Sequence, residues 1–337
     1  MINGIVNVYK PQGFTSFDVV AKLRGIFKQK KVGHTGTLDP DATGVLPVCL
    51  GNATRVCELL TDKDKTYETV MVLGISTDTQ DLSGQVTDRR KVDLSEAEVR
   101  DAVLSFVGEY EQVPPMFSAK KVDGKRLYEL AREGKVVERK SCLVKINDIE
   151  ILGMDLSDDA SFDFAGRNVL PISPGGMRIG PYVHMKVSCS KGTYIRTLCD
   201  DIGNKLSCGA SMAGLTRVQV GPFAIGETYT MDELSDIVAG VYASGDLPSL
   251  FTSGTVRSVD SVFMQYESGV VKADSMKKLL NGNVLETADF VAAPSGDNIR
   301  IYDGNEIFYA IYKRECSART GGADAYVPLK MFLPQEG

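Results

Sequence analysis

An aspartate lies at the centre of the most distinctive segment of the sequence, the glycine-rich stretch from Gly33 to Gly44. Three glycines and Pro40 within a dozen residues predict a tight, irregular loop between regular elements. Asp39 directly precedes the proline, which biases its backbone toward an extended conformation. Because a rigid scaffold can use such a loop to hold a side chain in a cleft, we interpret the Asp39 carboxylate as a candidate nucleophile or general base.

The residues of this loop also allow other interpretations. Asp39 and Asp41 could simply form Asx turns, and a metal-dependent enzyme could use Asp39, Asp41, Asp78 and Asp81. The chain has only two histidines and seven cysteines with no C-x-x-C pair, so we expect no zinc site and no other metal. Phosphate-loop, dinucleotide-binding and serine-hydrolase motifs are absent from the sequence.

Strands and helices that would hold the loop follow from periodicity and capping residues. Strands are predicted over residues 5–9, 45–50, 66–73, 143–152, 182–188 and 216–220, and helices over 16–27, 53–60, 93–106, 126–132, 193–206 and 275–280. They alternate without a regular βαβ period, so we expect an α+β fold. The polar stretch 157–181 is interpreted as a surface excursion and the Gly/Ser-rich stretch 245–254 as a linker.

The overall composition describes a globular protein with an uneven charge distribution. At 337 residues, 43% hydrophobic and 24% charged, the chain is long enough for two domains. It contains neither an apolar run long enough to cross a membrane nor a signal peptide, and its cysteines are interpreted as reduced, so we expect a cytoplasmic protein. The net charge is −6, yet the segment 112–145 carries nine basic and four acidic residues, which suits a basic arm that contacts nucleic acid.

Several segments, in the same order along the chain, resemble the TruB family of bacterial tRNA pseudouridine synthases. The resemblance begins with the segments 7–16 (NVYKPQGFTS) and 33–55, which has Gly-Thr-Leu-Asp-Pro at its centre. It continues through the segments 65–74, 113–120 (VPPMFSAK), 190–198 (SKGTYIRTL) and 214–217 (GLTR). Together these motifs span roughly residues 3–225, so we expect a pseudouridine synthase catalytic domain over 1–245, with a mixed or antiparallel central sheet and a thumb insertion over about 112–145.

The resemblance implies a role for each matching residue. Asp39 would attack the target nucleotide, Arg196 would hold that carboxylate ionised and oriented, and Tyr67 would stack on the base and take the carbon 5 proton. Tyr194 and Leu215 would close the pocket. The sequence leaves open whether Asp39 attacks the ribose or the base ring.

RNA contacts are implied as well, because the target uridine must flip out of its stack to reach Asp39. His34 would fill the gap left in the RNA loop. Basic side chains would contact phosphates, and these are Arg55, Lys65, Lys120, Lys121, Lys125 and Arg126.

The C-terminal region, residues 250–337, resembles a PUA domain, a small RNA-binding β-barrel. Its nine basic residues are outnumbered by eleven acidic ones, so its charge does not favour RNA by itself. The resemblance as a whole predicts an enzyme that isomerises the T-loop uridine 55 of tRNA, without cofactor or guide RNA, as a monomer. A tRNA chaperone that uses the same fold without catalysis is the alternative from a different functional class.

Overall fold

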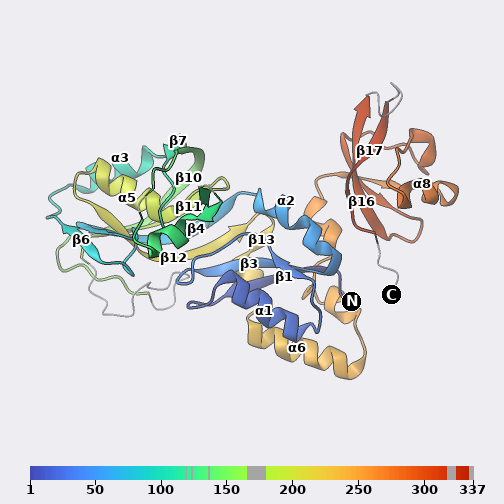
Figure 1. Ribbon diagram of the computed structural model, residues 1–337, viewed down its shortest axis with the longest axis horizontal. Helices are drawn as coiled ribbons and strands as arrows, with labels where there is room; N and C mark the ends of the chain where they lie inside the picture. Colours follow the sequence, from blue (N-terminus) through green and yellow to red (C-terminus); the bar gives the residue numbers. More distant parts are fainter. Residues whose placement is uncertain (119, 123, 136, 165–179, 317–323, 334–337) are drawn as a thin grey trace.

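The computed structural model describes residues 1–118, 120–122, 124–135, 137–164, 180–316 and 324–333. A nine-stranded sheet forms the core of its larger part, with the order β1-β3-β12-β4-β11-β10-β7; β2 pairs with β3 and β13 with β12 (Figure 1). Its strands are β1 (Gly4–Lys10), β2 (Val32–His34), β3 (Thr43–Leu50), β4 (Lys65–Leu73), β7 (Gly108–Gln112), β10 (Cys142–Asp155), β11 (Tyr182–Cys189), β12 (Ala210–Val220) and β13 (Phe223–Ala224).

The sheet is mixed, which confirms the predicted α+β class. β3 and β12 run parallel and pair Thr43 with Thr216 and Gly44 with Arg217, whereas the remaining pairs of the sheet are antiparallel. This parallel pair sets the end of the glycine-rich loop 33–44, the candidate catalytic loop, beside the middle of β12. A buried hydrogen bond of 2.6 Å between the Thr43 and Thr216 hydroxyls joins the two strands and fixes their register.

Helices cover different parts of this sheet (Figure 1). α1 (Ser16–Ile26) packs with α6 (Met231–Ser244) below β1 and β3, whereas α3 (Glu96–Leu104) and α5 (Ile195–Lys205) lie together over β10, β4 and β12. α1 begins at a capping box between Thr15 and Asp18, and α3 begins at the predicted box between Ser95 and Glu98.

Three sequence-based expectations differ from the structure. α6 was not predicted, and the supposed linker 245–254 contains α7 (Ser249–Thr252), whose Leu250 is buried in the core beneath α1. The predicted helix 53–60 is a 3₁₀ helix, η1 (Gly51–Val56), followed by the short α2 (Cys57–Thr61). Tertiary packing accounts for the second and third differences, because short apolar stretches take the conformation that buries them best. α6 has local signals of its own, a capping box between Thr230 and Glu233 and a C-terminal Gly245, which the sequence analysis did not use.

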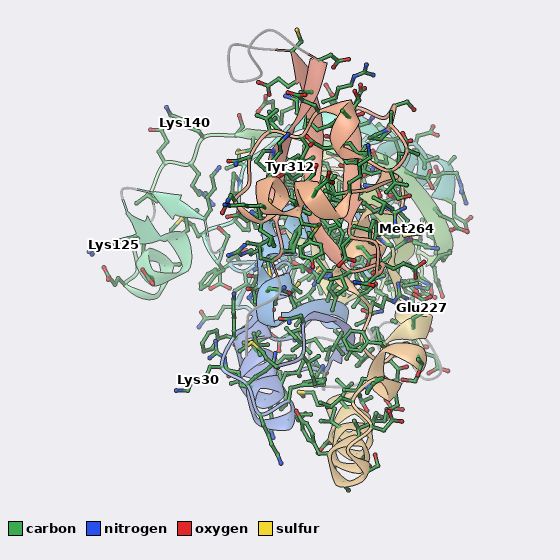
Figure 2. All side chains as sticks on the ribbon, turned by 90° about the vertical axis from the view of Figure 1, so that its right-hand side faces the viewer. Lys30, Lys125, Lys140, Glu227, Met264 and Tyr312 are labelled. Carbon is green, nitrogen blue, oxygen red and sulfur yellow. The ribbon has the colours of Figure 1, made fainter. Side chains whose placement is uncertain are left out.

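The thumb segment forms a small separate unit that projects from the body. It contains the paired strands β8 (Lys121–Val122) and β9 (Lys125–Arg126) and the helix α4 (Leu127–Arg132). Figure 2 shows the side chains of Lys125 and Lys140 at the outer edge of this unit. Another hairpin, β5 (Ile75–Thr77) with β6 (Val86–Arg89), carries the loop that meets the active site. Residues 165–179 of the predicted excursion lie outside the described residues.

The C-terminal region forms a four-stranded sheet, β14 (Glu267–Val270), β15 (Asn298–Tyr302), β16 (Phe308–Cys316) and β17 (Asp324–Met331), with α8 (Met276–Leu280) beside it. The described strands do not close into the expected barrel. Short 3₁₀ helices complete the chain, at η2 (Ile225–Glu227), η3 (Val259–Phe263), η4 (Ala273–Ser275) and η5 (Thr287–Asp289). Phe263 and Phe332 share one core with residues of β1, β3 and α2, which joins the C-terminal sheet to the body.

Candidate active site

The loop that carries Asp39 connects β2 to β3 and is anchored on both sides. Leu38, directly before Asp39, is buried, and its N–H donates to the Ser16 hydroxyl at 2.9 Å. On the other side Gly44 has φ = +103°, and an added Cβ would lie 2.3 Å from the Arg217 carbonyl oxygen. Only glycine fits this left-handed position against the neighbouring strand. The glycines of the motif thus shape the backbone that presents Asp39.

The buried Lys10 also binds this loop. The Lys10 ammonium is inaccessible to solvent and donates to the carbonyls of Pro11 (3.0 Å), Phe14 (2.6 Å) and Pro40 (3.0 Å). Burial lowers the pKa of Lys10 to about 8, although the carboxylates of Asp39 and Asp41 act in the opposite direction. Because Pro40 follows Asp39 directly, Lys10 fixes the peptide next to the candidate nucleophile.

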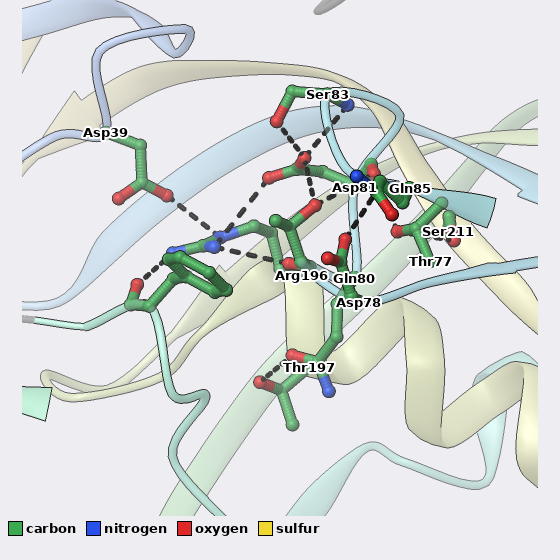
Figure 3. A network of polar contacts seen from close by, with 12 residues as sticks. Asp39, Thr77, Asp78, Gln80, Asp81, Ser83, Gln85, Arg196, Thr197 and Ser211 are labelled. Carbon is green, nitrogen blue, oxygen red and sulfur yellow. Dashed lines mark hydrogen bonds and ion pairs between the residues drawn. The ribbon is translucent and has the colours of Figure 1, made fainter. Parts of the chain in front are cut away.

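Asp39 meets Arg196, as the resemblance implies. The Arg196 Nε lies 3.0 Å from Asp39 Oδ2, in the arrangement that Figure 3 shows. The Asp39 side chain is 43% exposed, whereas that of Arg196 is 7% exposed. The N–H edge of a buried guanidinium thus contacts a carboxylate that remains open to a substrate.

The remaining nitrogens of Arg196 are also occupied. Nη2 donates to the Phe117 carbonyl at 2.8 Å, and Nη1 donates to the Thr79 carbonyl at 3.3 Å and lies 3.7 Å from Asp81 Oδ2. Since a guanidinium has five N–H groups in a rigid plane, contacts on several sides fix its orientation. Arg196 is therefore held in place before any substrate binds.

The loop after β5 presents Asp81 to Arg196 through a dense set of polar contacts (Figure 3). Asp81 Oδ1 accepts hydrogen bonds from the Thr79 hydroxyl (2.8 Å), the Ser83 N–H (3.0 Å) and the Ser83 hydroxyl. Gln80 accepts from the Thr197 hydroxyl at 2.9 Å, which ties the loop to α5. The loop thus places a second carboxylate behind the arginine.

Three of the four aspartates of the metal hypothesis have partners within the protein. Asp39 and Asp81 contact Arg196, whereas Asp78 accepts the Gln85 N–H at 2.7 Å. Burial, Asp81 and Asp39 together raise the pKa of Asp41. Among the described residues, no group of three or more His, Cys, Asp or Glu side chains is placed to hold a metal ion.

Tyr67 lies on β4 opposite Arg217 of β12. Burial raises the pKa of Tyr67, and the nearby Arg217, which hydrogen-bonds to it, acts against that shift. Arg217 is itself 1% exposed and donates to the carbonyls of Val45 (2.8 Å) and Gly36 (3.3 Å). One buried guanidinium therefore joins the tyrosine to both ends of the catalytic loop.

These side chains surround a small pocket of about 80 Å³ beside Asp39. Its walls include five residues predicted from the sequence, namely Asp39, Tyr67, Tyr194, Arg196 and Leu215. They come from the β2–β3 loop, β4, the start of α5 and β12, so the fold brings together residues that are far apart in the chain. His34 is half-buried at the end of β2 and is not part of this wall; its Nδ1 accepts the Gly36 N–H at 3.3 Å, and burial lowers the pKa of its ring.

The predicted phosphate contacts have different surroundings. Lys65 is buried, with its pKa lowered to about 8 by burial, and its ammonium donates to the backbone carbonyls of Thr61 and Lys63. A phosphate contact does not fit this placement, because a buried ammonium cannot meet RNA without leaving these partners. Arg55 is exposed and donates to the Met331 carbonyl at 2.8 Å in the C-terminal sheet.

Within the thumb, Lys125 is exposed, whereas Lys120 is half-buried and lies 2.7 Å from the Cys142 sulfur. The backbones of Lys121 and Arg126 pair across β8 and β9, but their side chains lie outside the described residues.

Three contributors to the site were not predicted in the positions that they take, and Asp81 was considered only as a metal ligand. Lys10, Asp81 and Arg217 are all buried and bind the catalytic loop, Arg196 or Tyr67. Lys10 could have been noticed, since it is the one charged residue in an otherwise apolar strand and precedes a proline. Asp81 and Arg217 offer no comparable signal, because their partners come from distant segments.

Comparisons with known proteins show the family to which the chain belongs. Residues 24–195 match the family described as TruB family pseudouridylate synthase (N terminal domain). Residues 196–260 match the family described as tRNA pseudouridylate synthase B C-terminal domain. The chain therefore belongs to the TruB family of pseudouridylate synthases.

Curated relatives extend this likeness over nearly the whole chain. The tRNA pseudouridine synthase B of Lachnoclostridium phytofermentans is 46% identical, over 98% of this chain and 100% of the relative. That of Clostridium kluyveri is 40% identical, over 90% and 93%. Among solved structures, the one described as a Cbf5-Nop10-Gar1 complex is 25% identical with a TM-score of 0.69, covering 98% of this chain and 85% of that chain. In the described part of the protein, no helix is long and apolar enough to cross a membrane.

Proposed function

We propose that this protein isomerises the T-loop uridine of tRNA, at position 55, to pseudouridine, with Asp39 as nucleophile. The observation that carries the proposal is the half-exposed Asp39 carboxylate, held 3.0 Å from the buried Arg196 at the wall of a pocket that Tyr67 shares. In this isomerisation the bond from ribose C1′ to uracil N1 breaks and a bond from C1′ to C5 forms. The C5 proton leaves and N1 gains a proton, so no atom is added overall.

The residues of the pocket suit these steps. Arg196 keeps the Asp39 carboxylate ionised and oriented, as a nucleophile requires. The Tyr67 ring stacks on the flipped base, and its phenol lies where it would accept the C5 proton; burial raises the pKa of that phenol, and Arg217 offsets part of the shift. Tyr194 and Leu215 complete the apolar wall around the base. Either attack by Asp39, on C1′ or on the base ring, is compatible with this arrangement.

The proposal assigns RNA recognition to three regions. The thumb, about 112–145, contacts T-stem-loop phosphates through Lys120, Lys121, Lys125 and Arg126, with Arg55 as a further contact. His34 fills the gap left by the flipped uridine. Residues 250–337 form a PUA-like RNA-binding domain after a catalytic domain over 1–245. The enzyme acts as a cytoplasmic monomer, without cofactor or guide RNA.

Tritium release tests the proposal directly. A T-stem-loop RNA carrying tritium at C5 of its uridines is incubated with wild type, Asp39→Asn and Asp41→Asn, in excess EDTA. We expect wild type and Asp41→Asn to release tritium and Asp39→Asn to release none, because Asp41 lies on the same loop but not in the pocket wall. Absence of release by wild type would refute the proposed reaction, and release by Asp39→Asn would remove Asp39 as the nucleophile.

A further inference from the structure

A buried glutamine next to the site has no part in the mechanism above. Gln112 is the last residue of β7, where the chain leaves the sheet toward the thumb, and its side chain is 1% exposed. Its backbone pairs with Cys142 of β10, so its position is set by the edge of the sheet. A primary amide in such a place requires partners for both its oxygen and its nitrogen.

The Gln112 amide makes two hydrogen bonds to the backbone of Tyr194. Its Oε1 accepts the Tyr194 N–H at 2.8 Å, and its Nε2 donates to the Tyr194 carbonyl at 3.1 Å. The same Nε2 also contacts the Tyr110 hydroxyl. Two bonds to one residue reproduce the pairing of a neighbouring β-strand, and they restrict rotation of the Tyr194 backbone as a strand would.

Tyr194 is where that restriction matters. It is the N-cap residue of α5, with φ = −104° and ψ = 111°, and its own side chain makes no capping hydrogen bond. Its ring lines the pocket beside Asp39, and Arg196 follows two residues later. The direction in which α5 starts therefore decides the placement of both side chains.

A second contact from the same stretch supports this assignment. Phe117, five residues beyond Gln112, offers its carbonyl to Arg196 Nη2 at 2.8 Å. The segment from the end of β7 to β8 thus touches the start of α5 twice, once at Tyr194 and once at Arg196. Gln112 itself is not among the pocket-lining residues.

We infer that Gln112 is a positioning residue for the isomerisation: its amide clamps the backbone of Tyr194 and so fixes the Tyr194 ring and Arg196 against Asp39. The inference rests on the proposed function for its activity readout. We expect Gln112 to affect the rate of the chemical step and not the binding of RNA, because its side chain is buried away from the surface.

Two variants of Gln112 and one matched control test the clamp. Gln112→Ala removes both bonds, whereas Gln112→Glu keeps the acceptor for the Tyr194 N–H. A neutral glutamic acid can also donate to the Tyr194 carbonyl, but a glutamate cannot. Gln29 provides the control, because its amide makes the same two bonds to the backbone of Ile2, of 3.0 and 3.1 Å, and neither residue lines the pocket.

Single-turnover rates of pseudouridine formation, measured with saturating enzyme, give the expected pattern. Gln112→Ala should lose about 10- to 100-fold in rate, the range expected when a catalytic group is displaced slightly, while its Kd for T-stem-loop RNA stays within threefold of wild type. Gln29→Ala should keep the wild-type rate. The ratio of the Gln112→Glu rate to the wild-type rate should rise as pH falls from 8 to 6, since protonation restores the second bond.

The ratio to wild type is needed because other groups titrate nearby. Tyr110 faces the Gln112 amide, and Asp201, Cys199 and Cys189 act on Tyr110 in turn; burial raises the pKa of Asp201 to about 6. These groups are present in both proteins, so the ratio removes the part of their titration that wild type and variant share.

Two outcomes would overturn the inference: a Gln112→Ala rate within threefold of wild type, or a Gln112→Glu ratio that does not change with pH. If Gln112→Ala does not fold, the pH dependence of Gln112→Glu still decides. Should wild type itself form no pseudouridine, the proposed function fails. The clamp is then judged by hydrogen exchange at the Tyr194 amide, which should be faster in Gln112→Ala, where the acceptor for that N–H is gone, than in wild type; equal exchange would refute it.

Discussion

Removing Arg196 should reduce stability and turnover by separate routes that a second substitution can distinguish. Asp81 is only 10% exposed, and its Oδ2 lies 3.7 Å from Arg196 Nη1. In Arg196→Met this carboxylate loses its cation, and breaking a buried pair from one side costs about 3–5 kcal/mol of unfolding free energy. Asp39 is 43% exposed, so water screens its charge and its share of the stability loss is small.

The double variant Arg196→Met/Asp81→Asn should recover about half of that stability, since the uncompensated charge is gone. It should not recover turnover, because Asp39 still lacks the guanidinium that orients it, and we expect both variants to lose about 100-fold or more in single-turnover rate. Urea unfolding, followed by tyrosine fluorescence, measures the first quantity, and tritium release from T-stem-loop RNA measures the second.

Arg90→Met is the control for this prediction. Arg90 and Asp88 form a shorter pair, 2.7 Å long, but their side chains are 51% and 43% exposed. Loss of this exposed pair should lower the unfolding free energy by at most about 1 kcal/mol and leave turnover unchanged. The reasoning is refuted if the double variant is as unstable as Arg196→Met, or if its turnover returns together with its stability.

Three further predictions concern the loop and the thumb. Burial lowers the Lys10 pKa from its ordinary 10.5 to about 8. Between these two pH values the unfolded chain binds more protons than the folded chain, so the unfolding free energy of wild type should rise with pH relative to that of Lys10→Met. Urea unfolding at several pH values measures this difference. Gly44→Ala should cost about 1–3 kcal/mol in thermal unfolding, whereas Gly25→Ala, in α1 with open space around it, should gain about 0.5–1 kcal/mol. Lys125→Ala should lower the slope of log Kd against log salt by about 0.7–0.9 and leave the saturated rate unchanged.

Local structure around the catalytic loop followed from nearby residues alone. Thr15 or Ser16 was expected to cap α1, and the cap is Thr15, in a box with Asp18; Ser95 and Glu98 cap α3 as their spacing predicts, because both partners of such a box lie within one helical turn. The glycine-rich loop before Asp39 was predicted for the same reason, since glycine and proline restrict the backbone wherever they occur.

The active-site pairing had a different origin. No spacing indicates that Arg196 meets Asp39; that expectation came from the resemblance to the TruB family, and the structure places the two side chains in contact. α6 was not predicted from the sequence, and Lys65, expected at phosphates, is buried under backbone carbonyls.

The sequence by itself thus determined the loop that presents Asp39 and the starts of the helices around it, because capping and turn preferences act over a few residues. Only the tertiary structure decided which charges are buried and what they bind. Lys10 reaches the Pro40 carbonyl because β1 pairs with β3 and sets Lys10 opposite Gly44, and Asp81 reaches Arg196 because the loop of the β5–β6 hairpin contacts α5. Such contacts depend on which strands become neighbours, and burial of the whole core settles that order.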